Sequence, residues 1–317
     1  MNGTTDKYRE PVVTAITGNL EHDGGAEELG KPPARWCDWH ELIAEHRPDV
    51  LLRQEMTYSR AEGHRRLHAA ERRLGMRGFL GAQGSGRNGT GLFVRPEVFD
   101  VHQQFEHPRL WRTPPTNIIA SLHEVPVPRI VMASWHLAFN SPHDREREAD
   151  EILALADKVN GGAAFIGGGD CNEYPHPAGE RVLPIDWTSK TITDRFHMMH
   201  RTNQGLGGSR VSCTYADEAL LGAGLHDPAR YAAHGPLAQK DALLPTAGHG
   251  KPTQGGDRRI DRIYVDPWLI NAVISVYVID TTGLSDHHAV AVVFSRAAMA
   301  ASLRRKMTAL EPYDLSA

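Results

Sequence analysis

Short runs of apolar and β-branched residues recur along the chain, and most of them end at Gly, Pro, Asn or Asp residues. Runs of this length and composition predict β-strands. The predicted strands are residues 12–17, 49–55, 90–94, 117–125, 129–137, 163–166, 258–265, 272–280 and 289–294. The run at 163–166 is wholly apolar, so we expect a central strand that is covered on both faces and stops at the triple glycine 167–169.

Other segments show helical spacing. Trp36, Trp39 and Ile43 recur on one face, and a serine and a proline at Ser141 and Pro142 predict the start of another helix. Residues 59–77 carry six arginines, which would form either a phosphate-attracting face or, as we favour, the solvated side of an amphipathic helix.

The connections differ in character. Residues 81–91 are rich in glycine and predict a hairpin connection, and a proline-rich turn is expected between the strands at 117–125 and 129–137. Residues 174–249 show no clear strands, and a connection of this length is usually functional or partly disordered.

The length of 317 residues, with 40% hydrophobic and 23% charged residues, suits a globular protein with a substantial core. We expect one domain over 11–296, between a loose leader at 1–10 and a basic helical tail at 297–317. The net charge of −4 argues against a broad, nonspecific surface for duplex nucleic acid. Nothing in the sequence favours a particular oligomeric state.

The cellular setting follows from what the sequence lacks. No apolar stretch has the length needed for membrane insertion, and the first residues lack the apolar core of a signal peptide. The three cysteines are widely spaced and odd in number, which is typical of free thiols in a reducing compartment. We therefore expect a cytoplasmic protein.

Polar side chains follow the apolar runs repeatedly, at the places where the predicted strands end or begin. They are Asn19, Glu55, His136, Asp170, Asn172, Asp261, Asp286 and His287. Several carboxylates gathered in one place are unfavourable unless a cation neutralises them. Oxygen-rich ligation without paired cysteines favours Mg²⁺ or Mn²⁺ over structural zinc.

The order of these motifs resembles the endonuclease/exonuclease/phosphatase superfamily, the DNase I-like fold group. The matching segments are Thr-Gly-Asn at 17–19, Arg-Gln-Glu at 53–55, Ser-Trp-His at 134–136, Gly-Asp-Cys-Asn at 169–172, Arg-Ile-Asp-Arg-Ile at 259–263 and Ser-Asp-His at 285–287. The resemblance implies an α/β (α+β) fold, a four-layered sandwich in which two mixed β-sheets pack face to face with helices outside. It also implies metal-dependent hydrolysis of phosphoesters, with Mg²⁺ or Mn²⁺ as cofactor.

The resemblance assigns metal binding to three positions. Glu55 would be the main ligand, with Asn19 and Asp286 alongside. The segment at 86–91 lacks the acid that DNase I-like members carry near the phosphate histidine, which argues against a close relationship to DNase I itself.

The remaining positions would carry the catalytic roles. Asp170 would orient or deprotonate the attacking water, and Asn172 would hold the phosphate. His287 is the alternative base or a stabiliser of charge. His136 would donate to a phosphoryl oxygen, and Asp261 would lie in the same cluster.

The resemblance leaves more than one function open. The first is a phosphodiesterase or nuclease with a phosphoester substrate such as nucleic acid. The second is a phosphomonoesterase, or a phosphodiesterase of lipid headgroups, acting on a small substrate. The third, a catalytically silent binding protein, is disfavoured because such a protein has no need of every metal and proton-transfer group. Specificity is expected in residues 102–115 and 174–249. A His-x-x-His pair at His197 and His200 lies in the second segment and favours surface histidines over a metal site.

Overall fold

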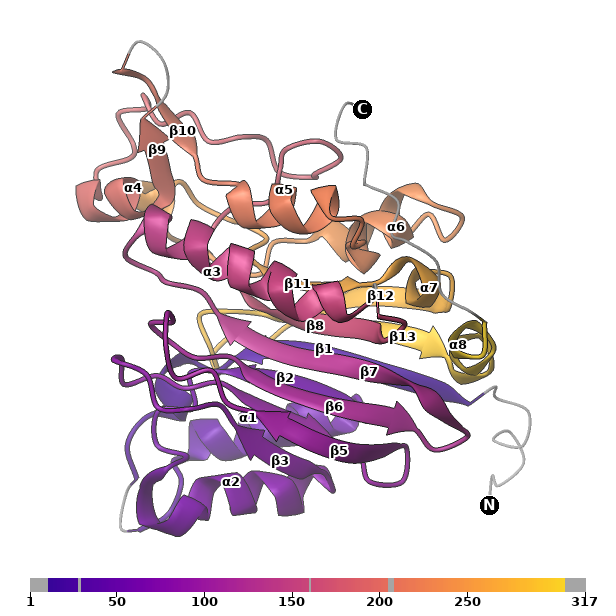
Figure 1. The fold of residues 1–317 in the computed structure, drawn as a ribbon. Coiled ribbons are helices and arrows are strands. Elements are labelled where there is room, and N and C mark those ends of the chain that lie inside the picture. Colours follow the sequence, from indigo (N-terminus) through magenta and orange to yellow (C-terminus); the bar gives the residue numbers. More distant parts are fainter. Residues whose placement is uncertain (1–10, 28–29, 160, 205–207, 306–317) are drawn as a thin grey trace, which may run out of the picture.

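Two mixed β-sheets form the centre of the computed structural model, which describes residues 11–27, 30–159, 161–204 and 208–305 (Figure 1). The larger sheet has the order β12-β13-β1-β2-β4-β3. Its strands are β12 (Val273–Ile279), β13 (Ala289–Ser295), β1 (Val12–Asn19), β2 (Val50–Gln54), β4 (Gly91–Val94) and β3 (Arg77–Leu80). The smaller sheet has the order β11-β8-β7-β6-β5. Its strands are β11 (Asp261–Val265), β8 (Ala164–Asp170), β7 (Val125–His136), β6 (Thr116–Leu122) and β5 (Phe99–Phe105).

Each sheet contains one parallel pair of strands among antiparallel neighbours. In the larger sheet β1 is parallel to β2, and in the smaller sheet β7 is parallel to β8. The carboxyl ends of two parallel strands lie at the same edge of their sheet, and an antiparallel neighbour begins at that edge. This topology brings the carboxyl ends of β1, β2, β7 and β8 and the starts of β11 and β13 to corresponding edges of the two sheets.

The inner faces of the two sheets pack against each other. Alternate residues of β1 and β2, such as Val13 and Leu52, meet Ile118, Met132 and Ile166 of the smaller sheet in one fully buried cluster. Because side chains alternate between the faces of a strand, the neighbouring residues point to the outer faces.

Helices cover both outer faces. Trp36 and Trp39 of α1 (Ala34–Glu45), together with Leu67 of α2 (Ala61–Leu74), pack on the outer face of the larger sheet. Ile152 of α3 (Pro142–Ala156) and Leu220 of α5 (Tyr215–Gly222) pack on the smaller one. Figure 1 shows these helices on opposite sides of the sheets, so the expected four-layered α/β sandwich is confirmed.

The segment 174–249 is more ordered than its sequence indicated. It contains α4 (Arg195–Arg201), the two-stranded sheet of β9 (Thr202–Gln204) and β10 (Arg210–Ser212), α5 and α6 (Pro228–His234). These elements are short, and only the tertiary fold brings their apolar residues into contact with the core. The strand β5 was also missed, because its polar and half-exposed residues show no apolar run.

Two local expectations were wrong. The triple glycine does not end the central strand but lies within β8, where a Cβ at Gly167 would stand 2.5 Å from the Trp135 ring and one at Gly168 would stand 2.6 Å from the Arg262 carbonyl. Glycine is needed here for close packing rather than for a turn. The expected proline-rich turn is also absent, because the prolines lie within β7 and the turn is formed by residues 123–124.

The hairpin expected around residues 81–91 is present, with β3 antiparallel to β4. At the carboxyl end, α7 (Pro267–Ile270) and α8 (Arg296–Leu303) pack at one end of the sandwich. The proposed leader at 1–10 and the part of the tail after residue 305 lie outside the described residues. None of the helices in the described part of the chain has the length and apolar character needed to span a bilayer.

Candidate active site

The polar residues singled out in the sequence meet at the edge where the parallel pairs end. Asn19 is the last residue of β1, and Glu55 directly follows β2. His136 and Asp170 are the last residues of β7 and β8 and lie side by side in the parallel register. From the antiparallel neighbours come Asp261, the first residue of β11, and His287, just before β13. These six of the eight predicted positions therefore lie in one region of the molecule.

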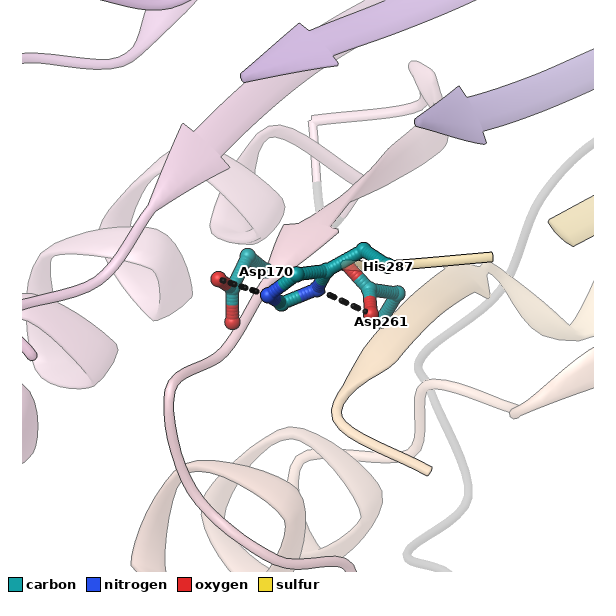
Figure 2. Close-up of side chains that lie close together, drawn as sticks. All are labelled: Asp170, Asp261 and His287. Carbon is teal, nitrogen blue, oxygen red and sulfur yellow. Dashed lines mark hydrogen bonds and ion pairs between the residues drawn. The ribbon is translucent and has the colours of Figure 1, made fainter. Parts of the chain in front are cut away.

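His287 lies between two carboxylates (Figure 2). Its Nδ1 is 2.8 Å from Asp261 Oδ2, and its Nε2 is 3.8 Å from Asp170 Oδ2. Both carboxylates are buried, and only 12% of the histidine side chain is exposed. Among the described residues, these three form a group whose candidate ligand atoms all lie within 4.8 Å of one another.

The electrostatics of this triad are unequal. Burial alone would lower the pKa of His287, but the carboxylates of Asp261 and Asp170 outweigh it and raise the pKa to about 10. Burial raises the pKa of Asp261 and also acts to raise that of Asp170, but His287, His136 and Arg201 together hold the pKa of Asp170 below its usual value. Asp170 is thus the carboxylate that stays ionised most readily.

A second group adjoins the triad through Asn19. The Nδ2 of Asn19 donates to Asp170 Oδ2 at 3.2 Å and to Glu55 Oε1 at 3.4 Å. The other carboxylate oxygen of Glu55 accepts from the backbone N–H of His22 at 2.7 Å. The Oδ1 of Asn19 is buried and has no hydrogen-bond partner among the residues that the structure describes. A buried oxygen acceptor beside a carboxylate fits a hard divalent cation, which prefers oxygen ligands.

His136 and Asn172 complete the wall of the site. The Nε2 of His136 is 3.5 Å from Asp170 Oδ2. The backbone N–H of Asn172, a residue with φ 51°, donates to Asp170 Oδ1 at 2.7 Å, and its side-chain Nδ2 donates to the carbonyl of Leu137 at 2.8 Å. Asn172 is therefore held in place from both sides.

Asp286 differs from the other predicted ligands. Its Oδ2 is 3.2 Å from Nζ of Lys251, and its Oδ1 is 4.0 Å from Nε2 of His287. Ser285 fixes this loop by donating from Oγ to the carbonyl of Asn19 at 2.7 Å. The structure therefore brings Asp286 to the histidine side of the site, next to a lysine that the motif pattern had not indicated.

A cavity of about 130 Å³ opens next to His287, and three cationic side chains contribute to its lining. Lys251 and Arg258 come from the loops before β11, and Arg201 comes from α4. Arg201 also donates to the carbonyl and the Oδ1 of Asn172, at 2.5 and 2.6 Å. Sequence reasoning missed these residues because isolated basic residues in irregular segments carry no spacing signal.

His197, also in the cavity, shares a hydrogen bond of 3.1 Å between its Nε2 and the hydroxyl of Tyr174. Burial and then Arg201 lower the pKa of His197 to about 4, so the ring is neutral. His197 and His200 both lie on α4 and are partly buried rather than fully exposed.

The sequence model of the Endonuclease/Exonuclease/phosphatase family matches residues 19–287, which is most of the chain and contains all eight predicted site residues. The chain is a member of this family. A search of curated protein sequences gives no match.

Solved structures with this fold carry the names of enzymes with different activities. A 3′-5′ exonuclease from Neisseria meningitidis is 21% identical, with a TM-score of 0.59 and coverage of 89% of this chain and 100% of the other. An AP endonuclease from Archaeoglobus fulgidus is 16% identical, with a TM-score of 0.58 and coverage of 89% and 99%. A mannosyl-6-phosphatase from Bacteroides thetaiotaomicron is 16% identical, with a TM-score of 0.53 and coverage of 88% and 98%. At these identities the likeness shows the fold alone.

Members of the endonuclease/exonuclease/phosphatase family are phosphoester hydrolases and generally depend on a divalent metal ion. The resemblance read from the strand-end motifs is therefore confirmed. The structural neighbours differ in activity, so the substrate of this protein has to be inferred from its own residues.

Proposed function

We propose that the protein hydrolyses phosphoesters with the help of Mg²⁺ or Mn²⁺, and that phosphodiesters, nucleic acids among them, are its first class of substrate. The observation that carries this proposal is the position of His287 between Asp170 and Asp261, directly beside the Asn19–Glu55 pair. A buried histidine held by two acids next to a set of oxygen ligands is suited to moving a proton near a bound cation.

Asn19 and Glu55 would hold the metal ion, and the unpartnered Oδ1 of Asn19 supports this assignment. Asp286 would join them when its contact with Lys251 is released. A divalent ion bound there would supply positive charge to the phosphoryl oxygens. The Asp170–His287–Asp261 triad is less suited to the ion, because the Nδ1 of His287 is already engaged with Asp261 at 2.8 Å.

The protein's own residues would then carry the proton and charge transfers. Asp170 is fixed by the amides of Asn19 and Asn172, so it can orient a water molecule and accept its proton. Asp261 fixes the orientation of His287, and a protonated His287 would donate to charge that develops on the phosphoryl group. His136 would donate to a phosphoryl oxygen, and Asn172 would border the phosphate.

A second candidate, a phosphomonoesterase, is favoured by one specific observation. Lys251, Arg201 and Arg258 line the cavity beside His287, and three cations suit the dianion of a monoester better than the single charge of a diester. The two candidates share the catalytic residues and differ in the group that occupies this cavity.

The test is a hydrolysis panel with Mg²⁺ or Mn²⁺. Bis-p-nitrophenyl phosphate and DNA represent diesters, and p-nitrophenyl phosphate represents monoesters. We expect turnover of diesters that disappears with a chelator and returns when the metal is restored. Faster turnover of the monoester would favour the second candidate. Absence of turnover with every substrate, or full turnover after exhaustive chelation, would contradict the proposed function.

A further inference from the structure

A larger pocket, about 400 Å³ in volume, adjoins the cavity that contains His287. Its walls come from residues 174–185, from residues 210–218 and from the pair 258–259. Pockets that hold small organic ligands have volumes of roughly 300–1,000 Å³, so this one has the size of a small-molecule site. The family motifs contribute only Arg259 to these walls.

Two side chains, Tyr174 and Arg258, line both the pocket and the cavity. The guanidinium carbon of Arg258 lies 5.6 Å from the centre of the Tyr174 ring, in a cation–π arrangement. Its nitrogens also donate to the backbone carbonyls of Gly255 and Asp257. Because the Tyr174 ring is only 6% exposed and supports Arg258, the pair positions a planar guanidinium at the boundary between the cavity and the pocket.

Apolar side chains form about half of the rest of the pocket wall, beside polar groups that include the charged side chains of Arg210 and Glu218. Val182, Leu183, Pro184, Ile185 and Val211 contribute to it. Leu183 is 83% exposed and Val211 is 49% exposed, so large apolar side chains face open space around a concave site. Exposed apolar residues gathered around a cavity indicate a binding site.

Contacts behind the pocket and an ion pair within its wall hold the walls in place. The Tyr174 ring packs 6.0 Å from the buried Trp187, and its hydroxyl is bound to His197. Arg259 forms an ion pair with Glu180, at 3.0 Å from its Nε, so this carboxylate does not add free negative charge to the pocket. A pocket with prearranged walls loses little conformational entropy when a ligand binds.

We infer that this pocket holds an aromatic ring system of the substrate, while the adjoining cavity holds its phosphoryl group. The inference rests on the proposed function, because it places the reacting phosphate at His287. The planar guanidinium of Arg258, backed by the buried ring of Tyr174, and the proline walls favour stacking with a planar group over contact with a flexible aliphatic chain. The substrate class is accordingly a phosphoester that carries an aromatic group close to the phosphate.

Two phosphonates test the inference by binding alone, because their C–P bonds resist hydrolysis. Methylphosphonate offers only the anionic head, and naphthylmethylphosphonate adds an aromatic ring system. In calorimetric titrations with Mg²⁺ present, we expect the aromatic ligand to bind at least about tenfold more tightly, as is typical of one good stacking contact. Equal affinities for the two ligands would overturn the inference.

Variants at exposed wall positions locate the effect. Leu183→Glu places a charge in the apolar wall, and Val211→Trp fills part of the pocket. Both positions are exposed, so folding should be unaffected. Each variant should remove most of the aromatic preference and leave methylphosphonate binding unchanged. Val127→Glu is the matched control, since Val127 is 72% exposed and lies at the far end of β7 from His136. An aromatic preference that survives both pocket variants would overturn the inference.

The source of the ring is distinguished by a second pair of ligands, deoxyadenosine 5′-monophosphate and deoxyribose 5-phosphate. If deoxyadenosine 5′-monophosphate binds more tightly than deoxyribose 5-phosphate, and Leu183→Glu abolishes the difference, the ring is assigned to a nucleobase. If only naphthylmethylphosphonate gains affinity, the ring is assigned to an aryl ester. If no phosphoester of the hydrolysis panel is turned over, the proposed function fails. If turnover is normal but neither aromatic ligand gains affinity, only the pocket assignment fails.

Discussion

Two buried clusters of charge differ in their balance of acids and cations. In the first, Asp170 and Asp261 both face His287, and His136 lies 3.5 Å from Asp170, so the two carboxylates are paired with imidazoles, whose charge depends on a bound proton. In the second, beneath α1 and α2, one acid, Asp23, has two arginines: Arg53 at 3.1 Å and Arg66 at 3.5 Å. The Asp23 cluster is completely buried, whereas the first opens to the cavity beside His287.

The pKa values of the buried histidines at the two clusters, His287 and His40, are shifted in opposite directions. The two carboxylates raise the pKa of His287 to about 10 against the effect of burial. Burial and then Arg53 lower the pKa of His40 well below its usual value, so His40 stays neutral. A cluster with surplus negative charge attracts protons and cations, and one in which each acid is matched by guanidinium groups is structural. The comparison thus distinguishes the candidate active site from the ionic framework of the molecule.

The largest expected effect is on catalysis, in Asp170→Asn. The substitution keeps the size of the side chain but removes the carboxylate that would orient and deprotonate the water. We expect kcat to fall by about a thousandfold, within the range typical of a lost general base. The measurement is turnover of the best phosphodiester at saturating Mg²⁺. Asp38→Asn, an exposed acid on α1, is the control and should be fully active. Wild-type turnover by Asp170→Asn would remove Asp170 from the mechanism.

The next effect is on stability, in Asp23→Asn. It leaves two buried arginines without their acid, which typically costs about 3–5 kcal/mol of unfolding free energy. Denaturant unfolding at pH 7 measures it. Adding Arg66→Met to the variant should recover part of the loss, because one unpaired charge is then removed. A loss below about 1 kcal/mol, the usual value of a surface ion pair, would show that the cluster is not structural.

A smaller effect is expected for Glu55→Gln, which keeps the hydrogen bond to Asn19 in reach but weakens the metal site. Activity should fall by about ten- to a hundredfold at low Mg²⁺ and recover in part at high Mg²⁺, since added cation offsets a weaker site by mass action. Titrations of activity against Mg²⁺ or Mn²⁺ measure the shift. An equal loss at every metal concentration would contradict a role for Glu55 in metal binding. Glu45→Gln on the exposed end of α1 provides the control.

The smallest effect is a pH dependence of stability from His40. Its folded-state pKa is lowered, so below pH 6.5 the unfolded chain binds a proton that the folded protein excludes. The contribution is therefore present above pH 6.5 and lost on acidification, at up to about 1.4 kcal/mol per pH unit. His40→Asn can still donate to the Trp36 carbonyl but does not titrate. Unfolding free energies at pH 7 and pH 5 should differ more for the wild type than for this variant. Identical differences would show that His40 does not resist protonation.

The sequence alone determined the class of fold and most of the site. Apolar runs located the central strands, and polar residues at their ends identified all eight candidate positions, which the structure places around one edge of the sandwich. These signals are local, because neighbouring residues in the sequence encode both the buried face of a strand and the residue that follows it. Strand β5 and the short elements of 174–249 have no such pattern, so they were missed.

Only the tertiary structure decided which charges meet. Lys251 reaches Asp286, Arg201 reaches Asn172, and Arg258 stacks on Tyr174 from segments with no regular spacing. The tertiary structure also decided that Gly167 and Gly168 lie inside a strand, since glycine is needed there to fit against Trp135 and Arg262 on neighbouring strands. Contacts between residues far apart in the chain depend on how whole layers pack, and local propensity carries no information about that packing. For this reason the candidate catalytic residues could be identified from the sequence, whereas the pocket that would select the substrate could not.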